Sequence, residues 1–219
     1  MKTNDKKDEI VKCIQKMSGR YTPYVIFSDW VKVCAITIQN SLQMIHDDTW
    51  KMREKQYLET MSKYNTEEKQ TLIKMYAMLI EAFEIEMTDI LGEIFMEAEC
   101  GSKNTGQFFT PFHLSYLTAK TAIPNDISEN NVLKISEPST GGGGMIIAAA
   151  KVLKERDINY QRCMDITAKD LDWNGVYMTY VQLSILGIKA IVIQGSSLEN
   201  QPITPERIFY TPKKMGMII

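Results

Sequence analysis

Four consecutive glycines, Gly141 to Gly144, lie shortly after an acidic residue, Glu137. They follow a short apolar run, Val132 to Ile135, and precede a pattern of apolar residues typical of a helix, Met145 to Leu153. A strand, a glycine loop and a helix in this order allow a ligand to approach the backbone closely, because glycine has no Cβ and tolerates positive φ. This arrangement predicts a site for a nucleotide-like cofactor.

Two other kinds of glycine loop do not fit the spacing. A P-loop for phosphate transfer needs a lysine directly after its last glycine, and the first basic residue here is Lys151. A dinucleotide fingerprint needs a third glycine three places after the second, where this chain has Ile146 or Ile147. A loop that only turns tightly, without a ligand, remains the alternative.

The elements that must position this loop alternate between strands and helices. Strands are expected at residues 132–135, 163–168 and 190–193, with helices from 145 to about 155 and from about 174 to 186. A βαβαβ order implies a parallel sheet with right-handed crossovers. Ligands of such sheets bind beyond the carboxyl ends of the strands, which is where the glycine loop lies. The predicted fold class is therefore α/β.

The N-terminal part of the chain predicts helices. Ser28 is expected to cap a helix whose apolar residues continue to Ile45, and residues 47–63 read as a more solvated helix. Asn65, with Glu68 three positions later, is expected to cap a longer helix that is rich in methionine. These methionines favour a helical core, with a groove for a partner as the alternative.

A second motif, Gly106-Gln107-Phe108-Phe109-Thr110-Pro111, lies about 30 residues before the glycine loop. Together the two motifs resemble those of adenine-N6 DNA methyltransferases, in the modification subunit of type I restriction-modification systems. The resemblance covers about residues 85–200 and includes the segment Asp89-Ile90-Leu91-Gly92. It implies a Rossmann-like fold that binds S-adenosylmethionine, preceded by a helical N-terminal subdomain.

The resemblance also implies a set of cofactor-binding residues. Gln107 to Pro111 would fold over the cofactor, with the phenylalanines as apolar cover and Thr110 as a polar contact, although Phe108 and Phe109 could instead belong to the core. The residues expected to contact S-adenosylmethionine are Gln107, Phe108, Phe109, Thr110, Pro111, Glu137, Pro138, Gly141, Gly142, Gly143, Gly144, Asp170, Leu171 and Ser196.

Carboxylates decide how tightly such a cofactor is held. Asp170 follows the second strand, where the resemblance implies that it accepts hydrogen bonds from both ribose hydroxyls, with Asp172 as the competing carboxylate. Glu137 takes the place of an aspartate in the family. Ser196 stands where the family has an aspartate near the adenine, and the loss of one charged hydrogen bond costs on the order of 1.5 to 3 kcal/mol. The affinity for the cofactor is therefore expected to be low.

The catalytic motif of these methyltransferases, [NDS]-P-P-[YFW], is not found in this sequence. None of the seven prolines is next to another, and the nearest imitation, Asn200-Gln201-Pro202-Ile203, lacks the second proline and the aromatic residue. No catalytic residue is therefore assigned. The second half of the sheet is expected to be absent or supplied elsewhere, so that self-association or a partner chain would cover the incomplete sheet. Met215 to Ile219 is a candidate covering segment.

Composition limits the other functions. The net charge of −2 and the pI of about 5.8 are unlike those of a stand-alone DNA-binding protein, so DNA is expected to be held through a complex. The four cysteines form no CxxC pair, which argues against a zinc site or a disulfide framework and favours the cytoplasm. No signal peptide or membrane-spanning run is recognised, and no metal is expected.

These observations lead to two domains and three hypotheses. Residues 1–104 are expected to form a helical region and residues 105–219 a partial Rossmann-like methyltransferase domain. The first hypothesis is an S-adenosylmethionine-dependent methyltransferase subunit that needs a companion carrying the catalytic loop. The second is a catalytically inactive protein of the same fold that acts by binding partners, and the third is a remnant of a decayed gene.

Overall fold

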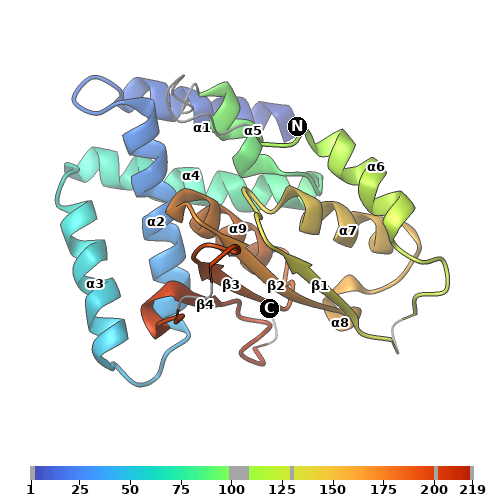
Figure 1. Ribbon diagram of the computed structural model, residues 1–219. Helices are drawn as coiled ribbons and strands as arrows, with labels where there is room; N and C mark the ends of the chain where they lie inside the picture. Colours follow the sequence, from blue (N-terminus) through green and yellow to red (C-terminus); the bar gives the residue numbers. More distant parts are fainter. Residues whose placement is uncertain (1–2, 99–108, 129–130, 200–201, 218–219) are drawn as a thin grey trace. The chain divides into compact units, whose positions relative to one another are not determined.

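The computed structural model describes residues 3–98, 109–128, 131–199 and 202–217, which form two compact units (Figure 1). The helical unit comprises residues 1–86 and 90–109, and the sheet unit comprises residues 87–89 and 110–219. The boundary that the sequence predicts between residues 104 and 105 lies outside the described residues.

The helical unit is built around α1 (Thr3–Met17), α2 (Pro23–Ser41), α3 (Asp48–Met61), α4 (Thr66–Ile85) and α5 (Ile90–Glu97). α1 packs against α2, α4 and α5, and α2 also packs against α3. Large apolar side chains from these helices are fully buried, including Ile10, Ile14, Phe27, Trp30, Met75, Leu79 and Phe95. Met75 and Met78 belong to this buried set, which confirms the interpretation of the methionines of α4 as core residues.

Capping side chains explain where two of these helices begin. The side chain of Asn65 accepts a hydrogen bond from the N–H of Glu68 at 2.9 Å, and the Glu68 carboxylate accepts one from the N–H of Asn65 at 2.7 Å, which confirms the predicted cap. The predicted cap at Ser28 is wrong, because α2 already begins at Pro23 and is capped by Thr22. Proline is favoured at this first helical position because its missing N–H would have no partner there.

The sheet unit consists of a four-stranded sheet with helices around it. Its elements are α6 (Phe112–Ala122), β1 (Leu133–Glu137), α7 (Gly144–Glu155), α8 (Tyr160–Cys163), β2 (Met164–Asp170), α9 (Trp173–Ile185), β3 (Ala190–Gln194), a 3₁₀ turn (Pro205–Arg207) and β4 (Ile208–Tyr210). The strand order is β1-β2-β3-β4, and the first three strands are parallel. The predicted α/β class and the βαβαβ order are confirmed.

The short fourth strand is not part of the sequence prediction. β4 pairs antiparallel with β3, and the residue that follows it, Thr211, fixes the pairing. The Thr211 hydroxyl accepts a hydrogen bond from the N–H of Ala190 at 2.9 Å and donates one to the carbonyl of Ile188 at 2.8 Å. This strand therefore depends on contacts between residues that are distant in sequence.

Helix α9 contacts both the sheet and the glycine loop. It packs against β2 and β3, and its residues from Asn174 to Ser184 are all buried. A helix that is buried on all sides can present polar side chains only to internal partners.

Within the described ranges, no helix combines the length and the apolar character needed to cross a membrane.

Candidate cofactor site

The predicted site residues of the sheet unit gather at the carboxyl ends of the three parallel strands. Glu137 ends β1, Asp170 ends β2 and Gln194 ends β3, and the strand register aligns Asp170 with Gln194. Beyond these ends, the N–H of Gly195 donates a hydrogen bond to the carbonyl of Asp170 at 2.8 Å. The structure therefore brings the glycine loop, Asp170, Leu171 and the loop containing Ser196 to one edge of the sheet.

The glycine loop needs glycine at two positions because of its backbone conformation. Gly141 has a φ of 53° and Gly143 a φ of 92°, and other L-residues adopt such angles only with strain. Gly143 precedes α7, and no side chain caps this helix. The first N–H groups of a helix have no partner within the helix and favour an anion, so the start of α7 offers donors to a ligand.

Two polar side chains of α9 hold the loop from inside. The Thr179 hydroxyl donates a hydrogen bond to the carbonyl of Gly141 at 2.9 Å, and the Gln182 amide donates one to the carbonyl of Gly142 at 2.6 Å. Thr179 and Gln182 lie one helical turn apart and are both fully buried. The loop is therefore fixed by the protein before any ligand binds.

A third internal contact comes from Asp89, far away in the sequence. Asp89 is 4% exposed, and its Oδ1 accepts the other hydrogen bond that the Gln182 amide donates, at 2.7 Å. A Cβ at Gly142 would lie 2.8 Å from both carboxylate oxygens of Asp89, and one at Gly144 would lie 3.1 Å from Oδ2. Asp89 therefore provides a steric reason for glycine at these two positions.

The structure gives Asp170 and Asp172 different contacts. The Asp170 carboxylate accepts hydrogen bonds from the N–H of Gly141 at 2.7 Å and from the N–H of Asp172 at 2.9 Å. Asp172 caps α9 by accepting a hydrogen bond from the N–H of Asn174 at 2.5 Å. Each oxygen of Asp170 can accept a further hydrogen bond, so its position next to the loop is compatible with a role as ribose ligand.

The remaining predicted residues of this edge make weaker or local contacts. A Glu137 oxygen accepts a hydrogen bond from the N–H of Ser139 at 3.3 Å, and Leu171 is 70% exposed. The Ser196 hydroxyl oxygen accepts a hydrogen bond from the N–H of Leu198 at 3.2 Å, within its own loop. The next residue, Ser197, links this loop to the end of β1 by donating to the carbonyl of Pro138 at 2.5 Å.

The predicted lid over the cofactor is only partly described. Gln107 and Phe108 lie outside the described residues. Phe109 belongs to the helical unit, where its ring packs edge-on against Phe95 with a centroid distance of 5.2 Å, so its alternative role as a core residue has support. Thr110 and Pro111 are exposed and precede α6 in the sheet unit. Their role in covering a cofactor stays a prediction.

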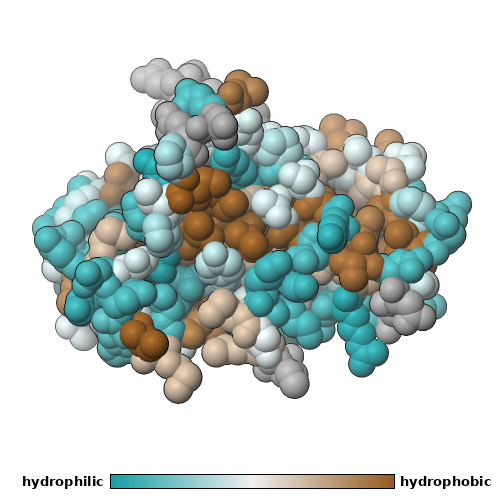
Figure 2. Space-filling model, turned by 60° about the horizontal axis from the view of Figure 1, so that its bottom comes forward, coloured by the Kyte–Doolittle hydropathy of each residue, from teal (hydrophilic) through white to brown (hydrophobic). Residues whose placement is uncertain are grey.

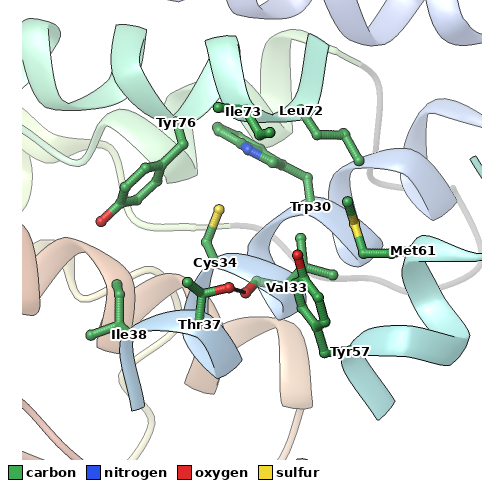
Figure 3. Close-up of a pocket in the computed structure, with 10 residues that line it drawn as sticks. All are labelled: Trp30, Val33, Cys34, Thr37, Ile38, Tyr57, Met61, Leu72, Ile73 and Tyr76. Carbon is green, nitrogen blue, oxygen red and sulfur yellow. Dashed lines mark hydrogen bonds between the residues drawn. The ribbon is translucent and has the colours of Figure 1, made fainter. Parts of the chain in front are cut away.

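A separate apolar pocket of about 340 Å³ lies between α2, α3 and α4 of the helical unit (Figure 3). Its walls include Trp30, Cys34, Tyr57 and Tyr76. Burial strongly raises the pKa of the Cys34 thiol, so the reactive thiolate is disfavoured. The Thr37 hydroxyl donates to the carbonyl of Val33 at 2.7 Å within its own helix. Neither the Cys34 thiol nor the Thr37 hydroxyl is therefore activated for chemistry.

The residues that hold the glycine loop were not predicted from the sequence. In the sequence, Asp89 stands out only as part of a segment that resembles the family, and Thr179 and Gln182 belong to no motif. The available signal is a pair of polar residues, three positions apart, within a mostly apolar helix. Among the described residues, no cluster of histidine, cysteine or acidic side chains could hold a metal ion.

Comparison with known proteins gives one family and several similar structures, two of which are methyltransferases. Residues 86–219, more than half of the chain, match the model of the N-6 DNA methylase family. No curated protein sequence matches the chain.

Both structures share 14% sequence identity with this chain. One is the methyltransferase subunit of a type I restriction-modification system from Streptococcus thermophilus, with a TM-score of 0.47 and coverage of 87% of this chain and 43% of that chain. The other, from Listeria monocytogenes, is described as a class I S-adenosylmethionine-dependent methyltransferase, with a TM-score of 0.48 and coverage of 92% and 57%. The chain thus spans about half the length of these proteins.

Proposed function

The chain belongs to the N-6 DNA methylase family, and from this premise we propose that its sheet unit binds S-adenosylmethionine as the cofactor-binding part of an adenine-N6 DNA methyltransferase. The observation that carries this proposal is the rigidly held glycine loop, with the Asp170 carboxylate 2.7 Å from the N–H of Gly141 at the carboxyl end of β2. A loop fixed before binding loses little conformational entropy when the ligand arrives.

Each group at this edge matches one part of the cofactor. The N–H groups at the start of α7 would attract the carboxylate of the methionine moiety, and Asp170 would accept hydrogen bonds from the ribose hydroxyls. Glu137 would face the amino group, while the exposed side chains of Leu171 and Leu198 would provide apolar cover for the adenine. When bound, S-adenosylmethionine supplies an activated methyl group.

Methyl transfer requires groups that these residues do not provide. The target amine must be aligned with the methyl group by polar contacts, and the target base must be flipped and stacked. The 219 residues contain no N-P-P-[YF] segment. We infer that a segment from outside these residues supplies this loop. Since the net charge of the chain is −2, DNA would be held mainly by other parts of the complex.

The surface next to β1 is the proposed contact with such a companion. Among the described residues, β1 pairs only with β2, so its outer edge has no strand beside it. On α6, Leu114 is 46% and Leu117 is 59% exposed, and a cavity of about 190 Å³ lies between α6, α7 and β1. Apolar side chains also form several brown areas on the face shown in Figure 2. Unpaired edges and apolar patches favour association, with a partner or a second copy.

Calorimetric titration of S-adenosylmethionine and S-adenosylhomocysteine into the purified chain tests the proposed function, with ATP as the control ligand. We expect both cofactor forms to bind with micromolar dissociation constants and ATP not to bind, because no lysine follows the glycine loop. Absence of binding to folded protein would contradict the proposal.

A catalytically inactive binding or regulatory protein is the second candidate. It is favoured by Ser196, which replaces a carboxylate and already uses its hydroxyl oxygen in a turn. The two candidates differ when the chain is combined with a companion that carries the N-P-P-[YF] loop. Transfer of a labelled methyl group to adenine in DNA would support the enzyme, and binding without transfer would support the inactive protein.

A further inference from the structure

Asp89 is a buried carboxylate that lies directly against the glycine loop. It is 4% exposed. Its Oδ1 accepts a hydrogen bond from Gln182 at 2.7 Å, and the same amide nitrogen donates to the carbonyl of Gly142 at 2.6 Å. Gln182 therefore uses both of its N–H groups to connect Asp89 with the loop.

The carboxylate also limits the loop sterically. A Cβ at Gly142 would come within 2.8 Å of both Asp89 oxygens, and contacts this short do not occur between real Cβ atoms and neighbouring atoms. Gly142 does not have a positive φ, so alanine there is opposed by the Asp89 side chain, which would have to shift, and not by the backbone. Removing the Asp89 side chain would consequently give the loop new conformational freedom.

Asp89 lies where the chain passes between the two units. Residues 87–89 belong to the sheet unit, but the chain enters them from Glu86 and leaves them at Ile90, both of which belong to the helical unit. Asp89 directly precedes α5. Residues 87–89 are therefore a backbone connection between the helical unit and the residue that contacts the glycine loop.

We propose that Asp89 is a positioning residue for the cofactor site: through Gln182 it holds the glycine loop in its binding conformation. This inference rests on the proposed function, because it concerns the same site. Asp89 would act without touching the cofactor, through the position of Gly142 and Gly144.

The test compares Asp89→Ala and Gln182→Met with Asp29→Ala, which removes a buried carboxylate of the helical unit and serves as the matched control. Hydrogen exchange measures the amides of residues 140–147, and calorimetry measures S-adenosylmethionine binding at a temperature where all variants are folded. We expect Asp89→Ala and Gln182→Met to raise loop exchange and weaken binding at least tenfold. We expect Asp29→Ala to lower the melting temperature only.

A double-mutant cycle with Gly142→Ala gives a second readout. Gly142→Ala should destabilise the wild-type chain but have a much smaller effect in the Asp89→Ala background, where the side chain that blocks a Cβ is missing. Equal effects in both backgrounds, or loop exchange and affinity unchanged by Asp89→Ala, would overturn the inference. Lack of S-adenosylmethionine binding by the wild type would contradict the proposed function. Hydrogen exchange of the loop, and the double-mutant cycle measured by thermal unfolding, would still decide whether Asp89 holds the loop.

Discussion

Two buried carboxylates, Asp29 in the helical unit and Asp89 in the sheet unit, are held by different kinds of partners. Asp29 is 7% exposed and accepts hydrogen bonds from the Lys63 ammonium group at 3.0 Å and from the Tyr64 hydroxyl at 2.9 Å. Asp89 is bound by Gln182 and lies against the glycine loop. The first carboxylate joins α2 to the segment between α3 and α4, so it stabilises helix packing, while the second determines the shape of a candidate binding site.

The largest expected effect on stability follows from removing Asp29. Asp29→Ala deletes the acceptor for a lysine and a tyrosine, but the Lys63 side chain is 40% exposed and can return to water. We expect the free energy of unfolding to fall by about 2 to 3 kcal/mol, measured by urea denaturation. The affinity of the folded variant for S-adenosylmethionine should not change, and a tenfold loss would show that the two carboxylates have similar roles.

An intermediate effect is expected from Gly175→Ala in α9. Alanine normally stabilises a helix relative to glycine by about 1 kcal/mol. Here a Cβ would lie 2.8 Å from Cγ of Asp170 and would push this carboxylate away from the N–H of Gly141. We therefore expect about tenfold weaker cofactor binding, or about 1.4 kcal/mol, with little loss of stability. Calorimetric titration checks this, and unchanged affinity would separate the position of Asp170 from cofactor binding.

The smallest effect concerns the pH dependence of the helical unit. Burial, with a smaller contribution from the nearby Cys34, raises the pKa of Tyr76 to about 12. The folded chain therefore holds this proton more tightly than the unfolded chain, whose tyrosines have a pKa of about 10. The resulting stabilisation of the folded state is fully present below about pH 10 and is lost between about pH 10 and 12. Tyr76→Phe should weaken the pH dependence of urea denaturation in this range. An unchanged dependence would show that Tyr76 does not contribute to it.

The fold could be predicted where sequence pattern and local chemistry agree. The apolar runs of β1, β2 and β3, the helices α7 and α9 and the capping box at Asn65 are local signals, and the structure has all of them. The helix α1 was not predicted because its first residues are polar, although Ile10 and Ile14 on its inner face are fully buried. β4 was not predicted because its pairing depends on the contact between Thr211 and the start of β3.

Only the part of the candidate site that is expected to face a ligand could be predicted from the sequence. The glycine loop is indicated by its own sequence pattern and Asp170 by its place after the second strand, and their contact with a ligand stays a prediction. The sequence pattern relates all four glycines to a ligand, whereas the structure shows that a Cβ at Gly142 would clash with Asp89 and that one at Gly144 would come close to it. Such a contact joins residues that are distant in sequence, so no local pattern indicates it.

The most direct test of cofactor binding at the glycine loop is calorimetric titration of S-adenosylmethionine into Asp170→Ala and Asp172→Ser. The serine keeps the capping oxygen of α9, so this variant is the matched control. We predict micromolar binding to the wild type, affinity within threefold of it for Asp172→Ser, and at least tenfold weaker binding for Asp170→Ala. Wild-type affinity in Asp170→Ala, or an equal loss in both variants, would contradict the assignment of this edge of the sheet as the cofactor site.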